Sequence, residues 1–323
     1  MTARLTAALC GLGNISWRFG KDAEGDALCH AEAMLQHPGV RLAGGCDPDS
    51  SFRAEFTAHH GLRTFEGLAE MLGALNPHIV SICSPAALHL EHAQRCIEHG
   101  VPMIWLEKPP AGDCSQLRLL LDQQKAQGGR STVLVNYQRR YTPCFVNLRD
   151  ALRRQTMGRL VRIDVNYSRG LETNGSHLLD QVFFLLGEDL GYTLDWVSGA
   201  SSANPCCGLT TAQGVRIVIQ GDELPYHNID IRATCEGGRL SILHGGMTTE
   251  VERIREHECY PGFYRLAQED ASLLGPGGQL GAFSTALEDL IEAHRSGRQP
   301  ISSLRSALSG QVLMERILPE ARS

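Results

Sequence analysis

Short apolar runs alternate with amphipathic runs through the first 136 residues of the chain. The apolar runs lack the polar alternation of a half-exposed strand, and they cover residues 5–13, 40–47, 78–84, 102–107 and 131–137. The runs between them have apolar positions at helical spacing, at 26–37, 52–61, 65–75, 88–100 and 115–129. Strands that alternate with helices predict βαβ units, and uniformly apolar strands indicate a sheet covered on both faces. We therefore predict an α/β domain with a doubly wound parallel sheet.

After about residue 140 the pattern changes to strand-like alternation of apolar and polar residues. Such runs occur at 160–169, 214–221, 227–236, 238–245 and 248–256. Helical spacing returns at 142–155, 176–187, 283–297 and 304–318. Alternating runs joined by short turns favour an antiparallel sheet. We predict two domains, an α/β domain over residues 1–137 and an α+β domain over residues 138–323.

The composition excludes several classes of protein. The 323 residues are 42% hydrophobic and 20% charged, with a formal net charge of −6 at pH 7. This composition argues against a disordered chain, and the mild acidity gives no overall attraction to nucleic acid or to an anionic membrane. No apolar run reaches the length of a membrane span, and we expect no signal peptide. The eleven cysteines are irregularly spaced, so we expect reduced thiols in the cytoplasm.

The first candidate site is the segment Gly11-Leu12-Gly13-Asn14-Ile15-Ser16 at the end of the first predicted strand. A dinucleotide fingerprint needs a tight glycine turn at this place, and Asp47 ends the second strand, where an acid accepts hydrogen bonds from the ribose hydroxyls. The acid repels a 2′-phosphate, which favours NAD over NADP. Glycines also mark ordinary turns, and Asp47 lies in an Asp-Pro-Asp run. Residues 17–25 look like an insertion that could lie over the mouth of the site.

Two further candidates could manage a proton. Lys108 follows the strand at 102–107, where ligands of open α/β sheets bind, although a solvated lysine at a strand exit is the simpler interpretation. His177 follows the helix-capping residues Asn174-Gly175-Ser176, with Asp180 one turn later, where a carboxylate can orient an imidazole. A capping segment with a core histidine is the alternative. His89 and His92 are three residues apart on a predicted helix but lack a nearby third ligand, so we predict no metal site.

Five segments together resemble the Gfo/Idh/MocA family of nicotinamide-dependent oxidoreductases. They are the glycine turn, Ser84-Pro85 with His89, Glu107-Lys108-Pro109, the run at 137–141, and Gly175-x-His177-x-x-Asp180. They occur in the family's order and approximate spacing, and the resemblance covers nearly the whole chain. Its specific part is Glu107-Lys108-Pro109 together with the histidine motif.

The resemblance implies an N-terminal Rossmann domain and a C-terminal domain with an open, mostly antiparallel sheet, in a homodimer or homotetramer. It implies that Lys108 is the catalytic lysine and His177 the proton-relay histidine. The implied cofactor contacts are Gly11, Leu12, Gly13, Asn14, Ile15, Asp47, Ser84, Pro85, His89, Glu107 and Lys108. The implied substrate contacts are Arg140, Tyr167, Thr173, Asn174 and Asp180. The implied substrates are sugars, sugar derivatives, sugar nucleotides and cyclic polyols.

One residue departs from the family's pattern. The family commonly has an Asp four residues before the histidine, and this chain has Thr173 there. The Asn-Gly-Ser-His form resembles a subgroup that also lacks the acid. The leading hypothesis is an NAD(H)-dependent oxidoreductase that acts on a secondary alcohol or ketone. The alternatives are a non-catalytic NAD(P)-binding regulator on the same scaffold, and a redox-neutral hydrolase or lyase with tightly bound NAD.

Overall fold

The structure is a computed structural model that describes residues 4–21, 25–199, 203–278 and 281–322. The chain divides into two compact units. The first contains Met1–Tyr141 and Gly281–Leu308, and the second contains Thr142–Leu280 and Ser309–Ser323. Among the described helices, none is long and apolar enough to cross a membrane.

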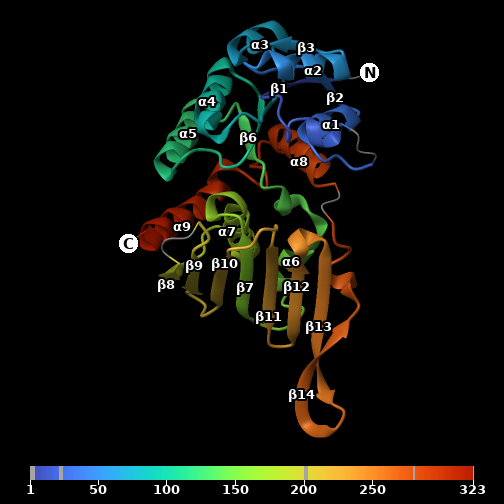
Figure 1. The fold of residues 1–323 in the computed structure, drawn as a ribbon, viewed down its shortest axis with the longest axis vertical. Coiled ribbons are helices and arrows are strands. Elements are labelled where there is room, and N and C mark those ends of the chain that lie inside the picture. The colour runs from blue at the N-terminus through green and yellow to red at the C-terminus, as the bar shows by residue number, and fades with distance from the viewer. Residues whose placement is uncertain (1–3, 22–24, 200–202, 279–280, 323) are drawn as a thin grey trace. The chain divides into compact units, whose positions relative to one another are not determined.

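The first unit is built on a six-stranded parallel sheet with the strand order β3-β2-β1-β4-β5-β6 (Figure 1). The strands are β1 Leu5–Cys10, β2 Val40–Cys46, β3 Arg63–Phe65, β4 Ile79–Ile82, β5 Met103–Leu106 and β6 Thr132–Val135. The order reverses between β1 and β4, and ligands of such sheets bind at the carboxyl ends of the strands at this point. The predicted α/β fold is confirmed.

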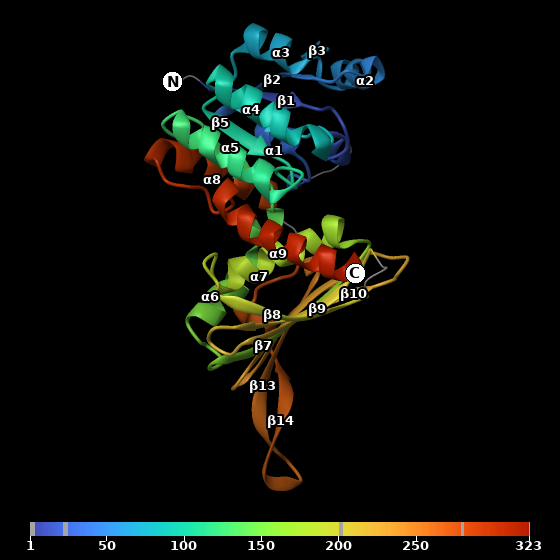
Figure 2. The ribbon, with the colours of Figure 1, turned by 90° about the vertical axis from the view of Figure 1, so that its left-hand side faces the viewer.

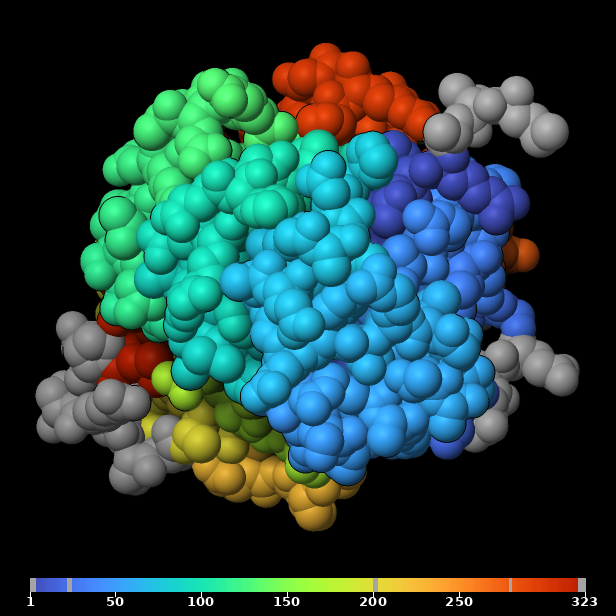
Figure 3. Space-filling model, turned by 90° about the horizontal axis from the view of Figure 1, so that it is seen from above, coloured from blue at the N-terminus to red at the C-terminus, as the bar shows by residue number. Residues whose placement is uncertain are grey.

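Helices cover both faces of this sheet, which explains why its strands are uniformly apolar. Along β1, Ala7 and Leu9 belong to one buried cluster, and Ala8 and Cys10 belong to another. The first cluster includes residues of α1 His30–Gln36, α2 Ser50–His60 and α8 Ala282–Ser296. The second includes residues of α3 Leu68–Leu75, α4 His89–His99 and α5 Cys114–Ala126. In Figure 3 the residues of α2, α3 and α4, coloured blue to cyan, form a continuous surface of this unit.

Helix α8 packs into the first unit, although the sequence-based division placed residues 283–297 in the second domain. Ala286, Leu287 and Leu290 are fully buried in the same cluster as β1. The hydroxyl of Tyr141 donates to Asp289 on this helix at 2.8 Å. An amphipathic helix shows which of its faces is buried but not which sheet covers that face, so the pattern alone left its partner open.

The second unit contains an eight-stranded sheet with the order β14-β13-β12-β11-β7-β10-β9-β8. Its strands are β7 Leu160–Ser168, β8 Tyr192–Ser198, β9 Cys206–Thr211, β10 Arg216–Asp222, β11 Ile229–Cys235, β12 Gly238–Leu243, β13 Thr248–His257 and β14 Tyr260–Glu269. All neighbouring pairs are antiparallel except β7 and β10, so the predicted, mostly antiparallel sheet is confirmed. Figure 1 shows β14 and the end of β13 extending past the other strands as a hairpin.

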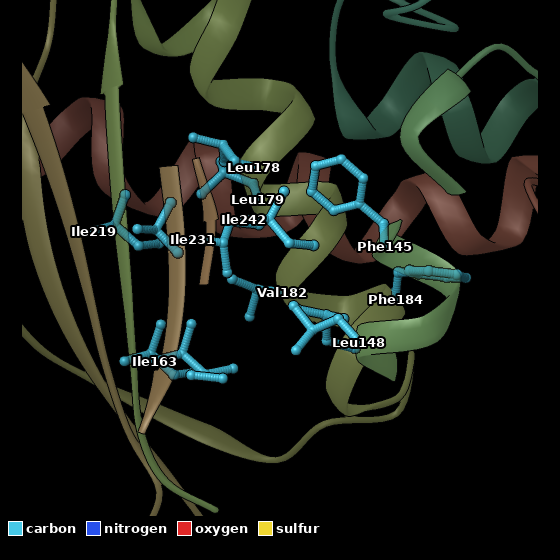
Figure 4. Close-up of a cluster of buried hydrophobic side chains, with 14 of the residues drawn as sticks. Phe145, Leu148, Ile163, Leu178, Leu179, Val182, Phe184, Ile219, Ile231 and Ile242 are labelled. Carbon is cyan, nitrogen blue, oxygen red and sulfur yellow. The ribbon is translucent and has the colours of Figure 1, made fainter. Parts of the chain in front are cut away.

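Helices cover one face of this sheet (Figure 2). They are α6 Pro143–Arg153, α7 Ser176–Leu186 and the later part of α9 Leu304–Arg322. Alternate strand residues such as Ile163 and Ile231 point toward Leu178 and Val182 of α7, as Figure 4 shows. This buried cluster gives α7, whose first turn carries His177, a rigid support.

Candidate functional site

A cavity of about 510 Å³ lies where the order of the parallel strands reverses. It is lined by residues from the carboxyl ends of β1, β2 and β4 and from the loops that follow them. The lining residues include Gly11, Gly13, Asp47, Phe52, Ser84 and Pro85. The structure thus brings five of the predicted cofactor contacts, all but Phe52, around one cavity.

The two glycines of the turn have different physical roles. Gly11 has a φ of +92°, and a Cβ added there would lie 2.7 Å from the amide nitrogen of Ser84. Only glycine fits this position, because both the backbone conformation and the neighbouring strand exclude a side chain. At Gly13 a Cβ would meet no atom within 4 Å, and the residue borders the cavity. Gly13 therefore leaves room for a ligand beside the main chain.

This difference predicts separate effects for two alanine variants. Gly11→Ala is expected to lower the melting temperature, since the left-handed conformation alone costs a residue with a Cβ about 1–2 kcal/mol. Gly13→Ala is expected to leave the melting temperature unchanged and to weaken NAD binding by about tenfold or more, since its methyl group enters the cavity. Thermal unfolding and calorimetric titration with NAD measure the two effects. Unfolding of both variants at the same lower temperature would contradict this assignment.

Asp47 fixes the glycine turn from the end of β2. Its Oδ2 accepts a hydrogen bond from the Leu12 amide at 2.9 Å, and its Oδ1 accepts one from the Asp49 amide at 2.9 Å. The side chain is 9% exposed and lines the cavity, while the Leu12 side chain is fully buried in the core. Each carboxylate oxygen keeps a second lone pair. The group can therefore accept ribose hydroxyls while it holds the turn.

The chain after Gly13 forms a long connection before the first α-helix, where the sequence predicted an insertion at 17–25. Asn14 is exposed and Ile15 packs at the edge of the core, within a single turn of chain. A 3₁₀ segment, Arg18–Gly20, follows, and α1 begins only at His30. Trp17 is buried against Phe56 of α2, which anchors the start of the inserted segment. The part of the expected insertion at 22–24 lies outside the described residues.

Lys108 is the second residue after β5 and is half-buried. Burial lowers the pKa of its amine, the Glu107 carboxylate opposes this change, and Arg139 adds to it. A buried, fully charged lysine is a poor proton acceptor, so this direction suits an amine that exchanges a proton.

His89 connects the two loops that border Lys108 and Ser84. Its Nδ1 lies 2.6 Å from the carbonyl oxygen of Pro109, and its Nε2 lies 2.8 Å from the carbonyl oxygen of Ser84. The ring is 1% exposed, so we assign it a structural role in holding the two loops together. Neighbouring His92 contacts the hydroxyl of Ser84 at 2.9 Å.

Glu107 is at the centre of a buried polar network. Its Oε1 lies 2.9 Å from Nε2 of His30 and also accepts from the side-chain amide of Asn136. Its Oε2 accepts from the main-chain amide of Lys108 at 3.2 Å. Ser81 completes the chain of contacts, with its hydroxyl 2.6 Å from Nδ1 of His30. These partners fix the orientation of the Glu107 carboxylate.

The charges in this network support one another. Burial opposes the charge of the His30 ring, but the Cys83 and Glu107 side chains outweigh it and raise the pKa of His30 to about 9. Burial would also raise the pKa of the Glu107 carboxyl, yet His30 and Asn136 hold that pKa below its usual value. Both shifts favour an imidazolium of His30 facing a carboxylate of Glu107.

Sequence reasoning missed His30, Ser81 and Asn136. They come from α1, from β4 and from the residue after β6, far apart in the sequence. The sequence contains only weak signals for these residues. Ser81 is a polar residue within the apolar run at 78–84, and His30 lies among alanines. Their contact depends on the strand order, which the pattern of apolar residues does not specify.

The second unit holds the predicted substrate contacts around the start of α7. His177 is half-buried in the first turn, and Asp180, one turn later, is 1% exposed. The side-chain amide of Asn174 donates to the carbonyl of Ser168 at 2.8 Å and lies 3.1 Å from Nδ1 of His227. The hydroxyl of Thr173 donates to the carbonyl of Arg169.

Two other predicted substrate contacts are deeply buried. Tyr167 is fully buried, and its hydroxyl donates to the carbonyl of Pro205 at 2.6 Å. Burial raises the pKa of this phenol well above its ordinary value. Arg140 is 1% exposed and donates to the carbonyl of Ile301 at 2.9 Å, within the first unit. Metal chemistry gains no support, since the described residues contain no group of three His, Cys, Asp or Glu suited to a metal ion.

Comparison with known proteins identifies the family of the first unit's sequence. Residues 5–137 match the model of an oxidoreductase family with an NAD-binding Rossmann fold. The matching model is that of the Gfo/Idh/MocA family, and the match spans all six strands of the parallel sheet. Within that family the cavity described above lies in the Rossmann unit that binds NAD, and the recognition made from the sequence motifs is confirmed.

Among curated relatives, the chain is 26% identical over 283 residues to inositol 2-dehydrogenase 4 of Saccharopolyspora erythraea, covering 80% of this chain and 79% of that protein. It is 25% identical over 178 residues to D-glucoside 3-dehydrogenase of Escherichia coli, covering 49% of this chain and 50% of that enzyme. The match to the uncharacterized oxidoreductase YhhX of Escherichia coli, at 27% identity, covers 43% of this chain and 44% of that protein.

Solved structures share the fold over nearly the whole chain. A putative NADPH-dependent oxidoreductase from Desulfitobacterium hafniense has a TM-score of 0.80 at 13% identity, with 98% of this chain and 96% of that chain covered. A UDP-N-acetylglucosamine 3-dehydrogenase from Acidithiobacillus ferrooxidans has a TM-score of 0.75 at 17% identity, with 99% of each chain covered. At such identities the likeness establishes the fold of both units.

Proposed function

We propose that the chain is an NAD-dependent dehydrogenase or reductase of sugar-like secondary alcohols and ketones. The observation that carries the proposal is the cavity at the switch point, lined by Gly11, Gly13 and Asp47. Its open space beside Gly13 fits a pyrophosphate, and the Asp47 carboxylate fits a ribose diol. NAD bound there supplies the acceptor for a hydride.

Side chains of the protein must accept the other product of alcohol oxidation, which is the proton of the hydroxyl group. When the C–H bond gives its electron pair to the nicotinamide, the O–H proton must leave to a base. We assign this role to His177 as acid and base, and we assign Lys108 to hold or polarise the oxygen. The lowered pKa of the Lys108 amine supports the assignment, because an amine that loses its proton more readily is better suited to proton exchange.

The substrate class comes from the relatives. They are named as dehydrogenases of inositol, of D-glucosides and of UDP-N-acetylglucosamine, all of which carry secondary alcohols on a ring. Thr173 stands where many family members have an acid, and its hydroxyl is bonded within its own turn. We therefore leave the proton step to His177 and Lys108, with Asn174 as a hydrogen-bonding residue for the substrate. Tyr167 has no part in the proposal.

A substrate panel tests the proposal. Inositols, free sugars, glycosides and sugar nucleotides are mixed with the enzyme and NAD, and absorbance at 340 nm reports the reduced cofactor. A rise with at least one of these classes supports the dehydrogenase. Binding of NAD without reaction across the panel would favour the non-catalytic regulator, and products without net reduction of the cofactor would favour the redox-neutral enzyme.

The preference for NAD depends on Asp47. The variant Asp47→Asn keeps the shape but loses the charge, and it is expected to bind NAD about 10–100-fold more weakly, since a hydrogen bond to a charged group contributes about 1.5–3 kcal/mol. Binding of NADP is expected to improve relative to NAD, because the repulsion of the 2′-phosphate is removed. Dissociation constants for both cofactors measure the change. An unaltered ratio would exclude Asp47 from the ribose site.

We also propose that the enzyme is a cytoplasmic homodimer or homotetramer. All eleven cysteines, each in a described segment, are free thiols, which suits a reducing compartment. The hairpin of β13 and β14 exposes three aromatic residues, Tyr260, Phe263 and Tyr264, more than a monomer's surface needs. Sedimentation analysis measures the assembly, and a single monomeric species at micromolar concentration would contradict it.

A further inference from the structure

The buried pair of His30 and Glu107 has a role that the proposed function does not yet assign. His30 is fully buried, and its ring lies 4.1 Å from the ring of Trp105 and 5.3 Å from that of Phe283, measured between centroids. Both ring nitrogens face polar atoms, Ser81 Oγ on one side and Glu107 Oε1 on the other. The packing leaves the ring one orientation, with Nε2 aimed at the carboxylate.

Glu107 links the His30 ring to Lys108, the next residue along the chain, through hydrogen bonds. One carboxylate oxygen contacts His30, and the other accepts the main-chain amide of Lys108 at 3.2 Å. The side-chain amide of Asn136 also donates to the carboxylate, and its own oxygen accepts from the Trp105 indole at 3.1 Å. A charged group in the core thus forms hydrogen bonds on both sides, as a buried carboxylate must.

We propose that His30 is a positioning residue that controls, through the Glu107 carboxylate, how readily the Lys108 amine gives up its proton. The inference rests on the proposed role of Lys108 only in its consequence for catalysis. The physical cause is charge compensation: an uncompensated carboxylate beside Lys108 would hold the ammonium form, whereas the imidazolium of His30 offsets that negative charge.

Other charged and titratable groups also act on this network. The Cys83 thiol at the end of β4 acts on His30, and Arg139 and Glu107 act on Lys108. The contact of 2.9 Å between Nε2 of His30 and the Glu107 carboxylate favours the cationic form of His30, and the raised pKa of the ring agrees with it. Loss of this positive charge removes the compensation, so the pKa of Lys108 must rise. Loss of the Glu107 charge must lower the pKa of Lys108.

The chain offers an internal standard for measuring this effect. It has three lysines, Lys21, Lys108 and Lys125, and the side chains of Lys21 and Lys125 are 42% and 74% exposed. Competitive acetylation with a limiting reagent at a series of pH values, followed by mass spectrometry, reports the uncharged fraction of each amine. The full-length enzyme is used without NAD or substrate, so the measurement needs no turnover.

The two single variants are expected to shift Lys108 in opposite directions. In His30→Gln, which keeps an N–H donor but no charge, the reactivity of Lys108 relative to Lys125 near neutral pH is expected to fall about tenfold. In Glu107→Gln the same ratio is expected to rise, and the double variant is expected to return toward the wild-type value. If His30→Gln fails to fold, the comparison of Glu107→Gln with the double variant decides, because only His30 differs between them and the double variant leaves no uncompensated buried charge.

Several outcomes would overturn the proposal. Equal ratios in wild type and both variants would show that the pair does not act on Lys108, and a shift in the same direction in both would indicate a general loosening of the core. The labelling result is independent of the proposed function. If Lys108→Ala keeps full activity while the labelling shifts appear as expected, then the function assigned to Lys108 is wrong and the role of His30 stands.

Discussion

Lys108→Ala is expected to lower kcat by about 10²–10⁴-fold, the usual range for a lost acid–base group. The amine is half-buried at the end of β5, and burial lowers its pKa. NAD affinity is expected to stay within about threefold of wild type, since the cavity is lined by other residues. Steady-state kinetics with the best substrate of the panel and calorimetric titration with NAD measure both values.

Lys125→Ala is the matched control, because this lysine is exposed on α5 and lies outside the cavity. It is expected to be indistinguishable from wild type. Near-normal turnover of Lys108→Ala would remove Lys108 from the mechanism. Loss of NAD binding in that variant would instead give Lys108 a role in holding the cofactor.

His177→Asn is expected to lower kcat by a similar factor of about 10²–10⁴. The residue is half-buried in the first turn of α7, which the large cluster of the second unit holds rigidly. In the direction of alcohol oxidation, wild-type activity is expected to rise with pH as the base loses its proton. This rise is expected to be altered in the variant, and pH profiles of kcat/KM measure it.

The control in the second unit is His244→Asn. His244 is exposed, and its ring contacts the Thr248 hydroxyl at 3.1 Å, well away along the sequence from the predicted substrate contacts. Its replacement is expected to change neither kcat nor the pH profile. A loss of activity of equal size in both histidine variants would indicate damage to the second unit and would contradict a specific role of His177.

The sequence pattern predicted both sheets, because a sheet buried on both faces has uniformly apolar strands and a sheet buried on one face has alternating strands. It missed β3, an edge strand of three residues, and it missed β8, β9 and β14 in the second sheet. All but the last residues of β14 are exposed, and β9 begins Cys-Cys-Gly, so neither shows the alternation of a half-buried strand. The pattern also placed the helix at 26–37 four residues too early, because the insertion before it has no clear period.

The sequence also predicted one part of the candidate site and missed another. The sequence predicted four residues of the cavity together, because parallel strands end at one edge of their sheet. The structure places these residues, Gly11, Gly13, Asp47 and Ser84, around one cavity. The network around Glu107 could not be predicted. It joins α1, β4, β5 and the end of β6 through side chains whose contacts depend on the strand order and on packing across the sheet.

We propose that Lys108 and His177 act together in the proton step of the reaction. A double-mutant cycle with Lys108→Ala and His177→Asn, read as kcat in single turnovers at 340 nm, tests it most directly. Groups that act as a unit are strongly non-additive, so the double variant is expected to be little slower than the slower single variant. Losses that multiply in full, or a single variant that keeps wild-type turnover, would contradict the claim.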